Sequence, residues 1–133
     1  MSALTAKELS AIADDFSKLA AEISNYIVQR RLSIRGRLGK VHFAILEEAE
    51  KLYTLSAMEV GVEAQKAVNQ LSDITTKILE SYQYLHDIKQ AMNLAVAALE
   101  VLTALTGKNI PALIAAVKTL GKKADMPLMD EDE

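Results

Sequence analysis

The feature that most constrains the fold is a series of apolar residues spaced alternately four and three positions apart between residues 67 and 102. Ten of its eleven members are apolar: Ala67, Leu71, Ile74, Ile78, Ser81, Leu85, Ile88, Met92, Ala95, Leu99 and Leu102. This spacing places the side chains on one face of an α-helix, as in a coiled coil. It predicts a single long helix that runs to about residue 106, roughly 75 Å at 1.5 Å per residue.

Two shorter seams with the same spacing precede it. The first comes after a predicted capping box at Thr5 and Glu8 and indicates a helix over about 6–32. Its apolar members are Leu9, Ile12, Phe16, Leu19, Ile23 and Tyr26. The second contains Ile34, Leu38, Val41, Ile45, Leu52 and Leu55, with Glu48 in the position between Ile45 and Leu52. The two seams differ in phase by about four residues, so the chain either turns at 33–39 or bends there within one helix. We favour a turn.

Capping signals set the remaining boundaries. Ser56 with Glu59 resembles a capping box and predicts that the long helix begins at 57. Gly107 is a helix stop and Asn109 a helix start, so a further helix is expected over 110–120, ended by Gly121. Residues 125–133 carry five acids and no base, which predicts an acidic disordered tail.

Together these signals predict an all-α fold, because glycine and proline account for only 7 of 133 residues. We expect a single helical domain over 1–124, built as an antiparallel bundle or an elongated hairpin. It would contain three to four helices with coiled-coil-like heptad seams. The chain has no cysteine, which excludes disulfides and cysteine-ligated zinc. Since the N-terminus shows no signal-peptide pattern, a cytoplasmic location is expected, with peripheral membrane association as the alternative.

The segment 91–120 gives the main functional hypothesis. Twelve of the sixteen residues in 91–106 are apolar and they are not confined to one stripe. A helix that is apolar all round is buried, either in the core of its own domain or against a partner. The second reading predicts a non-enzymatic interaction or assembly module, completed by self-association or by a protein partner. Its interface residues would be Leu94, Leu99, Leu102, Leu105, Ile110, Leu113, Ile114 and Val117.

The alternative is a membrane-active protein in which the same apolar hairpin meets a bilayer. The layout resembles that of the long-helix pore-forming toxins, which carry an apolar head on an elongated helical body. The lipid-facing charges would be a basic patch formed by Arg30, Arg31, Arg35, Arg37 and Lys40. The same patch is also explained as a solvated turn. Nucleic acid is not an expected partner, since the pI is near 5.4 and no phosphate-binding loop is present.

Arg37 and His42 give a third hypothesis. An arginine followed after four to six residues by a histidine is similar to the motif of HEPN ribonucleases, which are small all-α domains. The resemblance implies a metal-independent RNA-cleaving site, with the imidazole transferring protons and the guanidinium binding phosphate. The family's polar residue after the arginine is replaced here by Leu38. No Glu-x-x-His pair is present and His86 is isolated, so no cofactor or metal is expected.

Overall fold

The structure confirms that the chain is all-α apart from one pair of very short strands. The computed structural model describes residues 3–125 of the 133. In chain order the elements are β1 (Ala3–Leu4), α1 (Ala6–Gln29), α2 (Arg37–Leu52), β2 (Met58–Glu59), α3 (Gly61–Asn69), α4 (Leu71–Tyr82), α5 (Ile88–Thr106) and α6 (Ile110–Asp125). The strands pair antiparallel, with Leu4 opposite Met58, and join the N-terminus to the connection that precedes α3.

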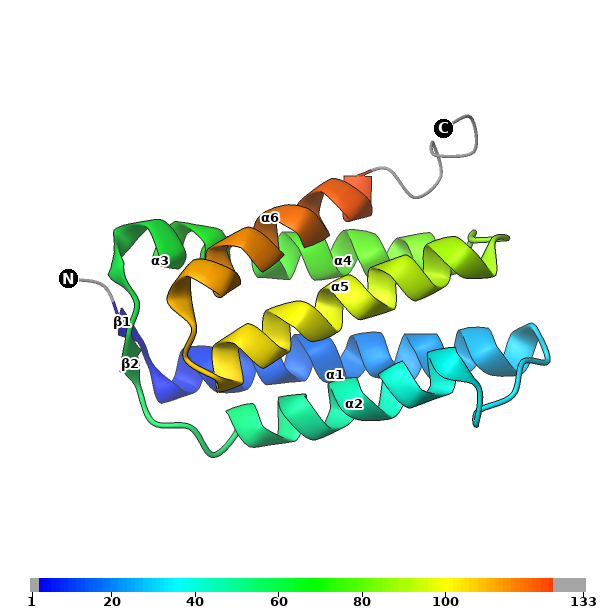
Figure 1. The fold of residues 1–133 in the computed structure, drawn as a ribbon, viewed down its shortest axis with the longest axis horizontal. Coiled ribbons are helices and arrows are strands. Elements are labelled where there is room, and N and C mark those ends of the chain that lie inside the picture. Colours follow the sequence, from blue (N-terminus) through cyan, green and yellow to red (C-terminus); the bar gives the residue numbers. More distant parts are fainter. Residues whose placement is uncertain (1–2, 126–133) are drawn as a thin grey trace.

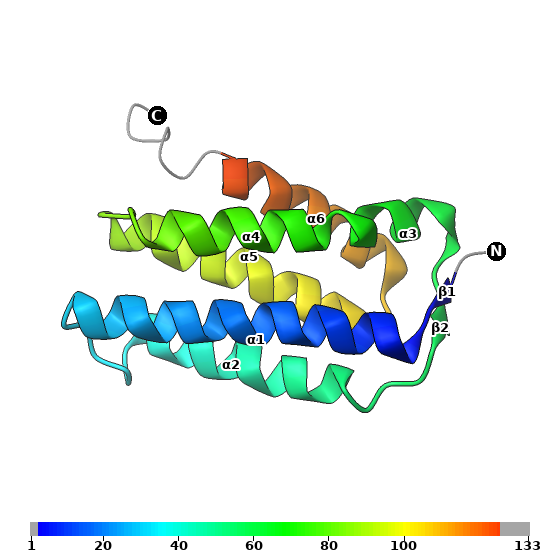
Figure 2. The ribbon, with the colours of Figure 1, turned by 180° about the vertical axis from the view of Figure 1, so that it is seen from behind.

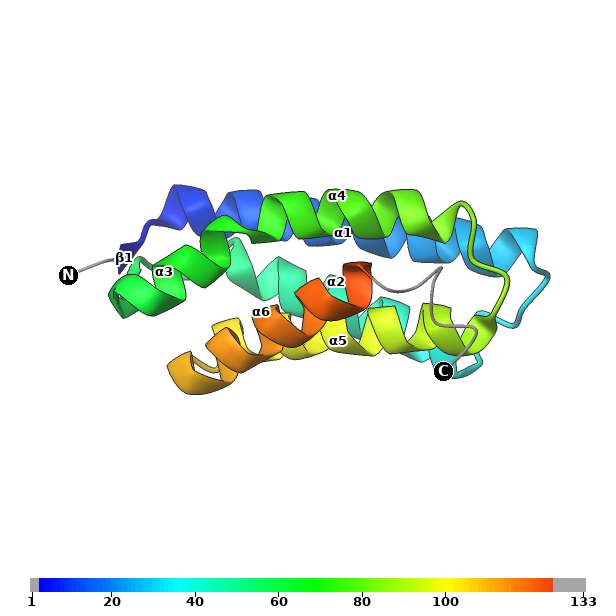
Figure 3. The same cartoon turned by 90° about the horizontal axis from the view of Figure 1, so that it is seen from above.

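The helices pack side by side as a bundle (Figure 1). Helix α1 contacts α2 and α4, and Figure 2 shows it between them. Helix α5 contacts α2 and α6. Figure 3 shows α1 and α4 along one side of the bundle and α2 and α5 along the other. Helix α6 also contacts α3 and α4. Helix α5 is therefore covered by α2 and by α6, and α6 is itself packed on α3 and α4.

Helix α1 forms as the sequence predicts. Thr5 and Glu8 make the reciprocal capping box, with both hydrogen bonds at 3.0 Å. All six residues of the first seam are buried, which confirms that this seam is the core face of the helix. The helix ends at Gln29, and the chain turns before α2 starts at Arg37, so the predicted break between the first two seams is confirmed.

The prediction of one long helix over 57–106 is wrong. The helix is interrupted at Gln70, between α3 and α4, and the chain reverses direction between Tyr82 and Ile88. Two hydrogen bonds hold this reversal: Tyr82 Oη donates to the Ala91 carbonyl at 2.6 Å, and the Arg30 guanidinium donates to the Leu85 carbonyl. Reversal lets α4 bury its apolar face on α1 while α5 buries its own on α2. Residues 3–125 therefore form more helices than the three to four predicted.

Two predicted boundaries are also wrong. Ser56 and Glu59 do not start a helix, because Met58 and Glu59 form β2 and place Leu4 and Met58 in the core. Gly121 does not end the last helix. It lies within α6 where that helix passes α4, and a Cβ added there would lie 3.4 Å from Ile74 Cδ1. A methyl group there would make ordinary van der Waals contact, so Gly121 is an interior residue of α6 and not a stop.

The first residue of the predicted acidic tail, Asp125, is helical. Asp125 is the last residue of α6, and its carboxylate pairs with Lys77 Nζ of α4 at 2.7 Å. The other residues of the predicted tail, 126–133, lie outside the described part of the chain. A single hydrophobic cluster extends through the described part from Leu4 to Ala124.

Candidate functional site

The α5–α6 hairpin is built by a very short turn. Lys108 adopts φ 56°, its N–H donates to the Leu105 carbonyl at 3.1 Å, and the N–H of Asn109 donates to the Ala104 carbonyl at 3.0 Å. These two bonds are the Schellman motif, which satisfies the last carbonyls of a helix. Asn109 Oδ1 then accepts a hydrogen bond from the Ala112 N–H at 3.2 Å and caps α6. The predicted stop at Gly107 and start at Asn109 are confirmed.

This tight turn buries most of the predicted interface inside the chain itself. Five of the eight residues have at most 1 % of their surface exposed: Leu94, Leu102, Leu105, Leu113 and Val117. They lie on the faces where α5 meets α2 and α6, and where α6 meets its neighbours. These five side chains are thus core residues of the folded chain and offer no surface to a partner. Leu99, Ile110 and Ile114 are half-buried at the edge of that core.

A groove of about 710 Å³ runs along the outward side of the hairpin, between α5 and α6. On α5 its lining includes Val96, which is 38 % exposed, together with Leu99. Its α6 side is formed by small residues, Ala112, Ala115, Ala116 and Thr119. Among residues 3–125, Glu100 is the one charged residue in the lining. The groove is therefore mostly apolar, its α6 wall is formed by small side chains, and its described lining contains one carboxylate, that of Glu100.

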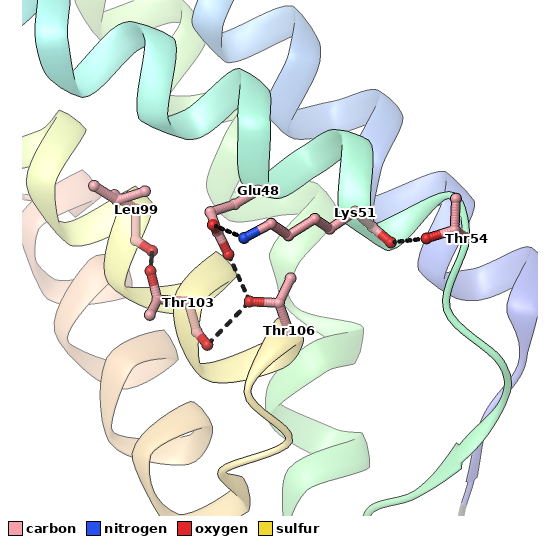
Figure 4. A network of polar contacts seen from close by, with 6 residues as sticks. All are labelled: Glu48, Lys51, Thr54, Leu99, Thr103 and Thr106. Carbon is pink, nitrogen blue, oxygen red and sulfur yellow. Dashed lines mark hydrogen bonds and ion pairs between the residues drawn. The ribbon is translucent and has the colours of Figure 1, made fainter.

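The C-terminal end of α5 is fixed to α2 by a polar contact (Figure 4). Glu48 of α2 accepts hydrogen bonds from Lys51 Nζ at 2.9 Å and from Thr106 Oγ1 at 2.6 Å. These hydrogen bonds lower the pKa of the Glu48 carboxyl below its usual value. The side chain that interrupts the second seam thus holds one wall of the groove in place.

The basic patch does not act as one unit. The Arg30 guanidinium is used within the fold, where it donates to the Leu85 carbonyl and lies 5.0 Å from the ring centroid of Tyr26. Arg31 occupies a positive-φ position at the end of α1. The remaining members, Arg35, Arg37 and Lys40, are exposed and form no ion pair among residues 3–125.

Arg37 and His42 are not both available to a substrate. Arg37 is exposed, whereas the His42 side chain is buried, with 7 % of its surface exposed. The rings of His42 and Phe43 meet edge-on, with their centroids 4.7 Å apart. Burial lowers the pKa of the imidazole, and Nδ1 has no hydrogen-bond partner within the described chain. The structure therefore gives no support to a ribonuclease site in which this imidazole meets RNA.

Two further features bear on function. Within residues 3–125, no group of three or more acidic, histidine or cysteine side chains could hold a metal ion. Helix α5 is long and apolar enough to cross a membrane by length and composition, with a mean hydropathy of 1.3. Half of that window is buried inside the fold, and core helices of soluble proteins pass the same test.

Comparison with protein-family models, with curated proteins and with solved structures found no match to this chain. The geometry of its surfaces is therefore the basis for assigning a function. Sequence reasoning selected the large aliphatic residues of 91–120 and missed the small residues that line the groove. Their signal is the recurrence of alanine at 112, 115 and 116, with threonine next at 119, which places them on one face of α6.

Proposed function

We propose that this protein is a non-enzymatic assembly module in which the α5–α6 groove binds α6 of a second copy. The observation that carries the proposal is the groove itself, an apolar channel beside a helix with a small-residue face. Because each copy has both the groove and the helix, two copies can exchange these contacts about a two-fold axis.

The shape of the groove favours a helix as its occupant. The small side chain of alanine allows two helix backbones to approach closely, and the α6 wall offers Ala112, Ala115 and Ala116. The α5 wall offers Val96 and Leu99, whose remaining exposed surface would be removed from water. Burial of such side chains contributes about 1.5–3 kcal/mol each when it is complete.

The charges favour α6 of a second copy over an unrelated apolar helix. The outward face of α6 exposes Pro111 and Ala115 together with Lys118 and Lys122. A helix with this face would bring a lysine toward the carboxylate of Glu100 in the opposite groove. Complementary charges at the edge of an interface mainly set orientation and partner choice.

The direct test is the solution mass measured by light scattering over a range of concentrations. We expect a dimer for the natural chain and a monomer for Ala115→Arg, which places a long charged side chain in the groove. Val62→Arg is the matched control, because Val62 is exposed on α3 and lies outside the groove lining. A natural chain that stays monomeric, or an Ala115→Arg variant that dimerises as before, would overturn the proposal.

Charge reversal sharpens this test. Glu100→Lys and the pair Lys118→Glu/Lys122→Glu should each weaken association with themselves, and a mixture of the two variants should associate with each other again. Flotation with anionic vesicles addresses the membrane alternative. If the natural chain floats with vesicles and shows no dimer in their absence, the apolar surface belongs to a bilayer.

A further inference from the structure

A second cavity lies at the other end of the bundle, where the α1–α2 connection meets the first turns of α5. It has a volume of about 410 Å³, within the range of roughly 300–1,000 Å³ typical of small-molecule sites. Four apolar side chains form much of its lining: Leu32 from the connection, Leu38 from α2, and Ile88 and Met92 from α5. Ile88 is 48 % exposed, so a ligand in the cavity would cover apolar surface that the fold leaves open.

Two cations from distant parts of the sequence also line this cavity. Arg37 begins α2 and Lys89 lies in the first turn of α5. Neither forms an ion pair among residues 3–125, and no acidic residue lines the cavity. Asp87, the residue before Ile88, is not part of the lining, and its Oδ1 accepts the backbone N–H of Lys89 at 2.8 Å. Within residues 3–125, the cavity lining therefore contains two cations and no acidic residue.

Ser33 adds a hydrogen-bond donor to the same lining. Its Oγ accepts the Arg35 N–H at 3.1 Å, so the hydroxyl proton is free to be donated elsewhere. An apolar wall with two cations and a hydroxyl offers complementary contacts to both ends of an amphiphile. The tail would remove apolar surface from water, and the head group would form charge-assisted hydrogen bonds.

We propose that this cavity binds a single-chain amphiphile with an anionic carboxylate head group. The chain would lie against Leu32, Leu38 and Met92, and the carboxylate would sit between Arg37 and Lys89. A bilayer surface is a poorer match to these observations. It would engage the exposed Arg35 and Lys40 as readily as Arg37, yet neither of those two lines the cavity.

The test is calorimetric titration of the full chain with decanoate below its micellar concentration. Acetate serves as the head group without the tail, and decyltrimethylammonium as the same tail with the opposite charge. We expect one decanoate per chain and no detectable binding of the other two. Replacing both cations, Arg37→Gln/Lys89→Gln, should weaken decanoate binding by at least about tenfold, because the carboxylate loses its charge-assisted hydrogen bonds.

The matched control is Arg35→Gln/Lys40→Gln, which removes the same charge from the same region but not from the cavity lining. It should change the affinity by less than about twofold if the carboxylate binds at the cavity and not to the general positive field. Equal losses in the two double variants would overturn the proposal in favour of diffuse attraction. Unchanged binding in Arg37→Gln/Lys89→Gln would overturn it as well. All four side chains are exposed, and circular dichroism would verify that each variant keeps its helix content.

Discussion

The two helical hairpins of this protein, α1–α2 and α5–α6, turn with the same backbone geometry and differ in the connection to the second helix. Arg31 and Lys108 both adopt φ 56°. In each case the next residue's N–H bonds to a carbonyl five residues back, Leu32 to Ile27 at 2.9 Å and Asn109 to Ala104 at 3.0 Å. Both helices thus end in a Schellman motif with a cation at the position where glycine is commonest.

The two connections start the second helix in different ways. In the α5–α6 hairpin, Asn109 comes directly after the turn residue and caps α6 with its own side chain. In the α1–α2 hairpin, several residues intervene and Gly36, the N-cap of α2, makes no side-chain cap bond. The long connection is held instead by the close approach of Ile34 to Gly39. A side-chain cap accompanies the tight α5–α6 hairpin with its groove, whereas a close backbone approach within the connection accompanies the open α1–α2 corner with its cavity.

The largest expected effect comes from adding one methyl group at the α1–α2 corner. A Cβ on Gly39 would lie 1.7 Å from the Ile34 carbonyl oxygen, which is backbone and cannot move aside alone. We expect Gly39→Ala to lower the free energy of unfolding by at least about 3 kcal/mol, as displaced backbone in a packed region does. Chemical denaturation followed by circular dichroism gives this value.

Gly107→Ala is the matched change at the other corner. Its Cβ would lie 3.1 Å from the Thr103 carbonyl oxygen, and Gly107 has ordinary helical dihedral angles. We expect a change within about 1 kcal/mol, since a small shift relieves the contact and alanine favours helix. Equal losses at Gly39 and Gly107 would show that the two corners are held in the same way.

The second prediction separates the interior and surface parts of α6. Leu113 has no exposed surface, whereas Ile114 is half-buried. Leu113→Ala should cost about 2–5 kcal/mol, the usual range for a buried leucine, and Ile114→Ala about 1 kcal/mol. Thermal or denaturant unfolding at low protein concentration measures both. A large loss for Ile114 alone would place the core face of α6 on the other side of the helix.

Sequence reasoning succeeded where a signal is local. The capping box at Thr5, the stop at Gly107 and the cap at Asn109 each depend on residues within a few positions of one another. The apolar seams identify faces that become mostly buried, with Ile34 and Ile88 as exposed exceptions, because a 3.6-residue period is set by the helix itself. These signals account for the all-α class, for both ends of α1 and for the C-terminal end of α5 to within a few residues.

Sequence reasoning failed where the outcome depends on distant contacts. The seam over 67–102 remains periodic through the reversal between Tyr82 and Ile88, and nothing local reveals that Arg30 will hold the Leu85 carbonyl. For the same reason the cavity could not be predicted: Arg37 and Lys89 are far apart in the chain, and only the packing of α5 on α2 brings them together. Apolar character identified residues 91–120 but could not divide them between core and surface.

The third prediction concerns pH and distinguishes the interiors of the two hairpins. The α1–α2 hairpin contains the buried His42, whereas the buried residues of α5 and α6 are all apolar. Because burial lowers the pKa of His42 in the folded chain, the unfolded chain binds more protons just below the ordinary value of 6.5. The free energy of unfolding should therefore fall as the pH is lowered through and below 6.5.

His42→Leu should remove this pH dependence, because leucine does not titrate. It should also raise the free energy of unfolding by about 1 kcal/mol, because the folded chain no longer buries a ring nitrogen that has no hydrogen-bond partner. Denaturant titrations at pH 5.5 and pH 7.5 provide the comparison. His86→Gln is the control, since His86 is exposed in the turn before α5. If the slope survives in His42→Leu and disappears in His86→Gln, the buried imidazole is not its source.

The smallest expected effect tests whether the shared turn geometry carries the same strain in both hairpins. A non-glycine residue in the left-handed region destabilises the folded chain by about 1–2 kcal/mol, and replacing it with glycine removes most of this strain. The same replacement lowers the free energy of unfolding by about 0.5–1 kcal/mol, because glycine gives the unfolded chain more freedom. Arg31→Gly and Lys108→Gly should therefore each raise the free energy of unfolding by about 0.5 kcal/mol. Arg31→Ala and Lys108→Ala, which remove the charge and keep the Cβ, should give no gain. A gain at Lys108 but not at Arg31 would mean that the longer connection relaxes around its turn residue, and the two corners would then differ in strain as well as in capping.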